Sequence, residues 1–178
     1  MAILLKNNNK QIAAGTGPNG QSVLSQFIHV ARPTLALPQS TTEQLFRVYG
    51  GRIWVRLLIG EVTTIIQSSD PVAKITSGRL DSAGALVGTV YDIASTLNMS
   101  SDEVGTIYTV EGDGTAIVSP QLAGAGYFGA VAGFVQPQGE IYLTTGASKT
   151  GAIKWDMWYQ PLDEGAYAVA IPTATAAI

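Results

Sequence analysis

The sequence predicts an all-β protein, a β-sandwich or barrel of about eight short antiparallel strands with an extended N-terminal arm. Three observations lead to this fold class. Runs of alternating or β-branched residues recur between turn signals, which is typical of strands. The chain contains 20 Gly and 8 Pro residues, which interrupt helices and form turns. Within residues 43–164, only residues 94–101 have a modest helical or turn character.

The domain organisation is predicted from the distribution of Gly, Pro, Asn, Ala and Thr along the chain. The 178 residues suit one domain with an added arm. Residues 1–42 contain an Asn run, a Gly-rich stretch and prolines, and they predict an extended arm in which only Ser22–Ala31 could form a short helix. Residues 43–165 predict the β domain. Residues 166–178 are rich in Ala and Thr and predict a loose tail or a final edge strand at Tyr167–Ile171.

The clearest local signal is Gly50-Gly51, which predicts a two-residue hairpin turn because glycine tolerates positive φ at both positions. Pairing outward from this turn places Tyr49 opposite Arg52. Since side chains alternate between the two faces of a strand, the neighbouring residues divide into two sets. The set expected in the core is Phe46, Val48, Ile53, Val55 and Leu57. The set expected on the opposite face is Arg47, Tyr49, Arg52, Trp54 and Arg56.

The other strands are predicted from β-branched and alternating runs. In the last of them Ile153, Trp155, Met157 and Tyr159 alternate with Lys154, Asp156 and Trp158, which is the period of two that a strand requires. The expected strands are, in chain order, Val62–Ile66, Pro71–Thr76, Val87–Ile93, Gly105–Val110, Thr115–Val118, Glu140–Thr145 and Gly151–Tyr159.

The composition excludes several kinds of chemistry. The chain has no Cys and one His, which removes disulfides, thiolate metal sites and Cys nucleophiles and leaves a poor basis for a zinc hydrolase. The single His29 lies among apolar residues and predicts a packed or interface histidine. Two Gly-x-Gly-x-x-Gly matches, at 15–20 and 124–129, lack the surrounding strand, helix and acidic residue of a dinucleotide site. The sequence therefore predicts no enzyme, no metal and no cofactor.

Two chemical alternatives stay open at this point. The turn at 111–114 could hold calcium, although it lacks the ligand number of an EF-hand loop. Two carboxylates brought together by the fold could hydrolyse a glycosidic bond. The candidate acids are Asp92, Asp102, Glu103, Glu111 and Asp113.

The charge distribution bears on partners. Charged residues make up 13% of the chain, about half the usual share, and such a surface suits coverage by another protein because interface cores are depleted in charge. The net charge of −3 argues against nucleic acid as a partner. The apolar run Leu122–Val135 is shorter than the roughly 20 residues of a spanning helix. No secretory signal opens the chain, so we expect synthesis in the cytoplasm and no membrane partner.

The cationic and aromatic face of the predicted hairpin is the best candidate for a functional surface. Trp, Tyr and Arg dominate the hot spots of protein interfaces. An ordinary solvent-exposed face and a nucleic-acid site are the alternatives, and the net acidity weakens the second. The expected partner interface comprises Arg47, Tyr49, Arg52, Trp54 and Arg56, with Phe27 and Ile28 from the arm.

Four segments of the chain resemble the small virion proteins that decorate the capsids of tailed bacteriophages. They are Leu45–Ile53, Gly60–Thr64, Thr150–Trp155 and Tyr159–Asp163. The resemblance spans residues 43–166 and is one of style and spacing. It implies a β-rich fold, an arm that lies on neighbouring subunits, and a homotrimer at three-fold positions of the capsid exterior.

The resulting functional hypothesis is a capsid decoration, or cement, protein of the virion that binds the major capsid protein and itself. The first alternative is a tail, head-fibre or host-binding module of the virion. Such a module needs a cluster of exposed aromatic residues, for which Trp54 and Trp158 are the candidates. A small enzyme that acts on carbohydrate is the second alternative.

Overall fold

The computed structural model describes residues 3–7, 10–14, 27–67, 72–110 and 133–172. The predicted strand at 115–118, both glycine motifs, and Glu111 and Asp113 lie outside the described residues. The strands are, in chain order, β1 (Ile3–Asn7), β2 (Lys10–Ala14), β3 (Ile28–Ala36), β4 (Thr42–Tyr49), β5 (Ile53–Thr64), β6 (Val72–Arg79), β7 (Tyr91–Asn98), β8 (Ile107–Thr109), β9 (Phe134–Gln136), β10 (Gly139–Thr145), β11 (Ala152–Pro161) and β12 (Tyr167–Ala170).

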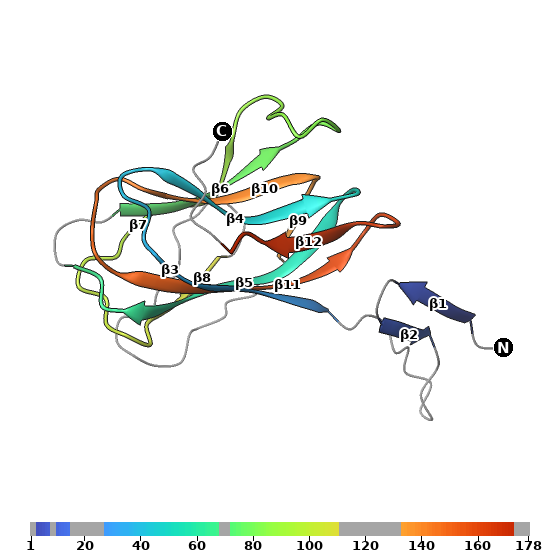
Figure 1. Ribbon diagram of the computed structural model, residues 1–178, viewed down its shortest axis with the longest axis horizontal. Helices are drawn as coiled ribbons and strands as arrows, with labels where there is room; N and C mark the ends of the chain where they lie inside the picture. Colours follow the sequence, from blue (N-terminus) through green and yellow to red (C-terminus); the bar gives the residue numbers. More distant parts are fainter. Residues whose placement is uncertain (1–2, 8–9, 15–26, 68–71, 111–132, 173–178) are drawn as a thin grey trace.

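The strands form a β-sandwich, which confirms the all-β prediction. One sheet has the order β12-β4-β10-β6-β7 and is called the β4 sheet below. The other, the β5 sheet, has the order β3-β11-β5-β8, with β9 also paired to β5. All pairings are antiparallel, and the two sheets lie as stacked layers (Figure 1). Strands β1 and β2 form a separate hairpin.

The predicted hairpin at Gly50-Gly51 is wrong, because β4 and β5 belong to different sheets. The chain crosses here from one layer to the other. Gly50 and Gly51 do adopt positive φ, of 72° and 139°. A Cβ at Gly50 would lie 2.6 Å from the carbonyl oxygen of Gly165, so the crossing is packed against the turn between β11 and β12. A glycine pair provides a tight turn equally well within a sheet or between sheets, and the pairing of distant strands decides which forms.

The prediction that Leu57 lies in the core is wrong, because β5 contains a β-bulge. Trp158 is opposite Leu57 and Tyr159 is opposite Val55, so Arg56 is the extra residue in β5. The bulge reverses the alternation, because the side-chain period of a strand is two. Leu57 is consequently only half-buried and Leu58 occupies the core instead. The remaining predicted core set is confirmed: Phe46, Val48, Ile53 and Val55 are fully buried.

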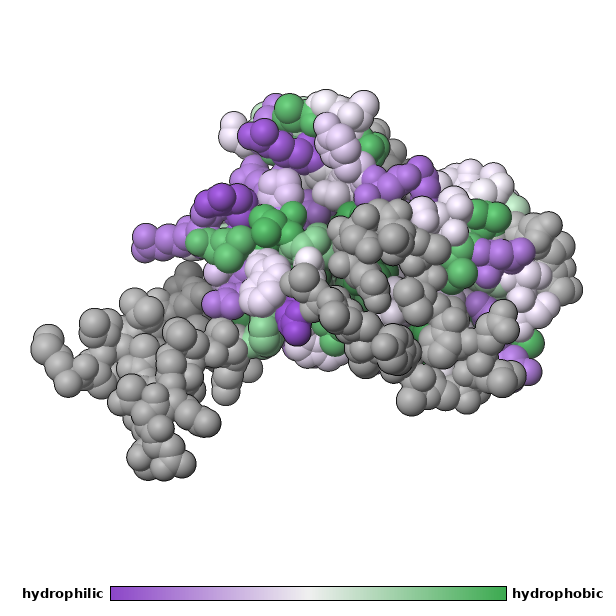
Figure 2. Space-filling view, turned by 180° about the vertical axis from the view of Figure 1, so that it is seen from behind, coloured by the Kyte–Doolittle hydropathy of each residue, from purple (hydrophilic) through white to green (hydrophobic). Residues whose placement is uncertain are grey.

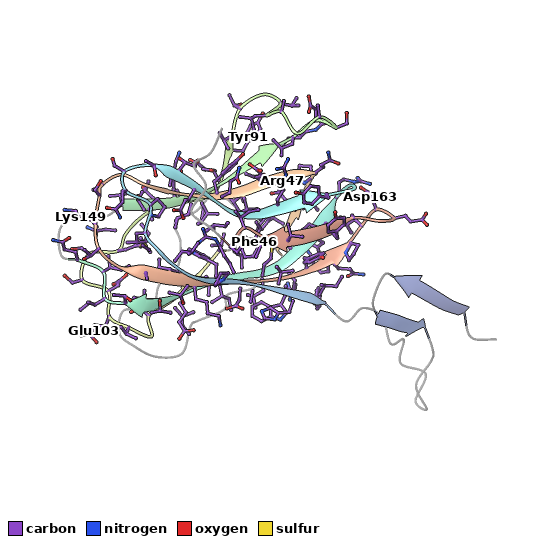
Figure 3. All side chains as sticks on the ribbon, in the orientation of Figure 1. Phe46, Arg47, Tyr91, Glu103, Lys149 and Asp163 are labelled. Atoms are coloured by element: carbon purple, nitrogen blue, oxygen red, sulfur yellow. The ribbon has the colours of Figure 1, made fainter. Side chains whose placement is uncertain are left out.

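The centre of the sandwich is filled by aromatic and aliphatic side chains from both sheets. Phe46 of β4 lies between the layers, whereas Arg47 lies on the outer side of the β4 sheet (Figure 3). Trp155 of β11 is fully buried opposite Gly60 of β5. A Cβ at Gly60 would lie 2.9 Å from the Trp155 ring, so the glycine leaves the space that this ring occupies. The alternation predicted for Ile153 to Tyr159 is confirmed.

Strand β3 changes the boundary of the predicted arm. It is an edge strand that pairs with β11, so residues 28–36 belong to the sandwich, and the helix expected at Ser22–Ala31 is replaced by strand from Ile28 onward. Ile28 and Val30 are two residues apart, which is the spacing of a strand with one buried side. Pairing with β11 supplies the hydrogen bonds that make this segment an edge strand. At the other end β12 pairs with β4, which selects the edge-strand alternative for residues 167–171.

The middle of the chain differs from expectation in two places. Residues 94–101 were expected to have helical or turn character, and Ala94 to Asn98 instead continue β7. The strand expected at 87–93 begins only at Tyr91, because the preceding residues form a loop closed by an isolated bridge between Leu80 and Leu86. Pairing with β6 accounts for both changes, since β7 gains its hydrogen bonds from a neighbour that local propensity does not register.

Candidate partner interface

Several aromatic side chains of the described residues gather on the outer side of the β5 sheet. Trp54 of β5 makes an edge contact with Phe27, just before β3, with ring centroids 5.8 Å apart. The guanidinium of Arg56 lies over the Trp54 ring, 5.7 Å from its centroid. Both residues point away from the core because Ile53 and Val55, which alternate with them, are buried. Phe27 is 37% exposed, so an apolar edge faces solvent beside the cation–π pair.

A second stacked pair extends this surface onto β11. His29 of β3 stacks on Trp158 with ring centroids 4.4 Å apart. The His29 ring also hydrogen-bonds through Nε2 to the Oδ1 of Asp156, at 2.7 Å. Lys154 lies 3.1 Å from the other oxygen of Asp156. The imidazole is thus held both by stacking and by a polar contact at a partly exposed position.

Strand pairing joins the two pairs into one surface, which we call the aromatic face: Phe27, His29, Trp54, Arg56 and Trp158. Trp158 is opposite His29 on one side and Leu57 on the other. Gln160, two residues further along β11, is opposite Trp54. Trp54 and Trp158 are therefore diagonal neighbours on the same side of the sheet, a spacing at which aromatic side chains can interact. Three strands that are far apart in sequence build this face.

The predicted interface residues do not form a single surface. Trp54, Arg56 and Phe27 belong to the aromatic face. Ile28 is on the inner side of β3 and packs against the core. The predicted face is divided because its two strands belong to opposite layers, not because the alternation within either strand was misread. His29 and Trp158 were not in the predicted interface, although the alternation in β11 places Trp158 on its outer side.

Two predicted residues lie on the outer side of the other sheet. Tyr49 stacks on Tyr167 of β12, with ring centroids 5.2 Å apart. Arg47 lies over the Tyr49 ring and 3.5 Å from a carboxylate oxygen of buried Glu140. This cluster is smaller than the aromatic face. Figure 2 shows how the described surface seen from behind carries apolar areas separated by polar residues.

Arg52 forms a third, separate site at the crossing between the layers. Its guanidinium donates two hydrogen bonds to Asp163, Nε at 2.9 Å and Nη2 at 2.8 Å. The backbone N–H of Arg52 donates a further bond of 2.7 Å to the same carboxylate. Hydrogen bonding to Arg52 lowers the pKa of Asp163 from 3.8 to about 2. Arg52 is thus occupied in bracing the turn between β11 and β12.

The Arg52–Asp163 pair predicts an acid-dependent contribution to stability. Because the pKa of Asp163 is depressed in the folded state, the contribution is present above 3.8 and is lost as the pH falls towards 2. We expect the difference in melting temperature between the wild type and Asp163→Asn to be largest at neutral pH and to vanish at the acid end. Thermal unfolding at a series of pH values measures this difference in melting temperature. Asp81→Asn, which changes a carboxylate in another turn, is the matched control. An equal difference at all pH values would contradict the assignment.

Two of the candidate carboxylates, Asp92 and Asp102, contact different residues of the described chain. Asp92 pairs with Lys74 at 3.1 Å, and Asp102 accepts a hydrogen bond from buried Tyr108. Within the described ranges, no group of three or more His, Asp or Glu side chains is close enough to hold a metal ion. In the same part of the chain no helix has the length and apolar character needed to cross a membrane.

The chain was compared with known protein families, curated proteins and solved structures. No protein-family model, no curated protein and no solved structure matches the chain.

Proposed function

We propose that this protein is a non-enzymatic structural protein that binds and stabilises the mature capsid of a tailed phage from its outer surface as a homotrimer. The aromatic face is the observation that carries this proposal. The four segments that resemble capsid decoration proteins and the low share of charged residues support it as well. Its partners are then the major capsid protein and further copies of itself.

The composition of the aromatic face suits a protein partner. It combines two Trp rings, a Phe ring and an Arg, which are the residue types that contribute most to binding energy in interfaces. The rings are already held by one another, since Phe27 and Arg56 contact Trp54 and His29 stacks on Trp158. A preorganised surface loses less side-chain entropy on binding than a mobile one.

The stabilising mechanism follows from mass action. A protein that binds the assembled shell, but not its separated subunits, shifts the equilibrium towards the shell by an amount that grows with its concentration relative to Kd. Many identical sites on one shell, and several sites in one oligomer, convert modest single contacts into strong attachment. No group on the aromatic face needs to act as an acid, base or nucleophile for this role.

Substitution of one ring tests the aromatic face. Trp54→Ala removes the ring that contacts both Phe27 and Arg56, so we expect the affinity for purified shells lacking this protein to fall about 30-fold or more, the effect of a hot-spot residue. Tyr49→Ala is the matched control, because Tyr49 is also a stacked aromatic residue but lies on the other sheet. Sedimentation with shells measures both, and thermal unfolding verifies that both variants are folded. Equal affinities for Trp54→Ala and the wild type would contradict the proposal.

Copy number separates the decoration role from the alternative virion roles. A site repeated over a closed icosahedral lattice occurs in multiples of about 60, whereas a tail or vertex component occurs in about 3 to 12 copies. Quantitative mass spectrometry of purified virions against the major capsid protein gives this number. Hundreds of copies support decoration, a handful supports a tail, head-fibre or host-binding module, and absence from the virion rules out both.

A further inference from the structure

A pocket of about 250 Å³ lies on the outer side of the β4 sheet, on the opposite layer from the aromatic face. Its floor comes from neighbouring strands: Thr144 of β10 is opposite Thr42 of β4 and Lys74 of β6. In the adjoining row Tyr142 is opposite Thr76. The residues that line it are Thr42, Lys74, Thr76, Leu86, Val90, Tyr142 and Thr144.

Thr76 is the residue of the pocket floor whose hydroxyl is best placed to meet a ligand. Thr76 has a relative exposure of 4% and lines the pocket, so the small part of its surface that stays accessible opens into it. A hydroxyl can both donate and accept hydrogen bonds, so a polar molecule inside the pocket can use it in place of water.

The other polar groups of the floor keep part of their hydrogen-bonding capacity. The hydroxyls of Thr42 and Thr144 lie 2.8 Å apart and share one hydrogen bond, so one of the two protons and several lone pairs remain. Tyr142 donates its proton to Glu140 at 2.7 Å, which leaves the phenolic oxygen as an acceptor. The floor therefore presents neutral donors and acceptors side by side.

The electrostatics of the pocket favour an uncharged ligand. Among the described residues of the lining, Lys74 is the only charged one, and its ammonium pairs with Asp92 at 3.1 Å. Burial, followed by the hydrogen bond to Glu140, raises the pKa of Tyr142, so this hydroxyl stays neutral. The Glu140 carboxylate behind Tyr142 disfavours an anion, and the described lining residues include no carboxylate for a cation.

The opposite wall of the pocket is aliphatic. Leu86 and Val90 come from the segment between β6 and β7, which rises from the end of β6 in Figure 1, and Tyr91 marks its return to β7 in Figure 3. The segment is fixed at its base by the bridge between Leu80 and Leu86 and by a turn in which the Asp81 carboxylate accepts hydrogen bonds from two backbone N–H groups. A fixed wall makes the pocket a preformed feature.

We propose that this pocket binds a single neutral sugar ring. A pyranose has a rim of hydroxyls, which can meet the Thr and Tyr hydroxyls of the floor, and an aliphatic C–H face, which can pack against Leu86 and Val90. The volume is just below the range of about 300–1,000 Å³ that is usual for drug-sized ligands, so one ring fits better than a chain of rings. This site is independent of the function proposed for the aromatic face and lies on the other layer of the sandwich.

Ligand-observed NMR and isothermal titration with the full chain test this proposal, with glucose, galactose, mannose and N-acetylglucosamine as the probes. We expect at least one of them to bind saturably, with a Kd of about 1 mM or tighter. Thr76→Val preserves the shape of the side chain and removes its hydroxyl, and it should weaken that binding about 5- to 10-fold. Val90→Trp fills the pocket from a partly exposed position and should abolish binding.

Two controls locate the binding. Thr64→Val makes the same chemical change at an exposed position on the β5 sheet and should leave the affinity unchanged. Trp54→Ala should also leave it unchanged, because Trp54 is on the aromatic face. The proposal is overturned if none of the four sugars binds saturably, if Thr76→Val and Val90→Trp bind like the wild type, or if Trp54→Ala abolishes binding. Thermal unfolding of each variant separates loss of binding from loss of the fold.

Discussion

Replacing Arg32 with Ala is expected to lower the free energy of unfolding by about 3–5 kcal/mol, the usual effect of breaking a buried ion pair from one side. Arg32 of β3 is 1% exposed and Glu43 of β4 is 6% exposed. Their side chains meet at 3.1 Å between Nη2 and Oε2. Without the guanidinium, the Glu43 carboxylate would stay buried with no compensating charge.

The position of Arg32 explains why this effect should be large. Its Nε donates a second hydrogen bond, of 2.9 Å, to the carbonyl oxygen of Ile171, which follows β12. One side chain thus ties β3 of the β5 sheet to β4 and to the chain after β12 of the β4 sheet. Burial lowers the pKa of Arg32, and the contact with Glu43 opposes this change by favouring the charged form. The pair therefore depends on both partners.

Denaturant unfolding of three variants isolates the ion pair. Arg32→Ala should show the full loss, and Arg79→Ala, at an exposed position on β6, serves as the control with little effect. The double variant Arg32→Met with Glu43→Leu replaces the pair by apolar side chains and should recover most of the stability. If Arg32→Ala unfolds at the same denaturant concentration as Arg79→Ala, the ion pair does not join the sheets.

Replacing Trp155 with Ala is expected to lower the free energy of unfolding by about 3–5 kcal/mol, because it opens a cavity at the centre of the sandwich. Among the described residues, Trp155 is the largest fully buried side chain, and it lies against Gly60. Its Nε1 is buried and makes no hydrogen bond with any residue that the structure describes. An unpaired buried donor of this kind costs about 1–3 kcal/mol.

The unpaired donor leads to a second expectation at the same position. Trp155→Phe removes ring volume, which destabilises, and also removes the unpaired N–H, which stabilises. We expect the two effects largely to offset one another, so that Trp155→Phe loses less than about 1.5 kcal/mol, far less than Trp155→Ala. Denaturant unfolding compares the two variants. A loss in Trp155→Phe as large as in Trp155→Ala would show that the N–H is satisfied in solution.

The burial of individual strands could be predicted because it depends on a local pattern. In β11 the alternation of Ile153, Trp155 and Met157 with polar neighbours needs no knowledge of the partner strand. The same reasoning failed at Leu57, because the bulge at Arg56 arises from the register of β5 against β11. A bulge is a property of two strands that lie about 100 residues apart, and neither sequence alone specifies it.

For the candidate sites, too, the direction of a side chain could be predicted from the sequence, but its neighbours could not. The outward direction of Trp54 and of Trp158 follows from alternation within each strand. Their meeting on one face follows from the pairing of β5 with β11, and the separation of Trp54 from Tyr49 follows from the crossing between layers. The pocket around Thr76 gave no signal in the sequence, because its floor comes from β4, β6 and β10 and its wall from a loop.

The sequence by itself determined the all-β class, most of the strands and the inward or outward side of most residues, since turn chemistry and a period of two act over a few residues. Only the tertiary structure decided which strands share a sheet, that residues 28–36 complete the sandwich, and which outward residues become neighbours. These outcomes depend on hydrogen bonds and packing between segments far apart in the chain. Local preference is nearly the same for several such pairings, and burial of one common core selects among them.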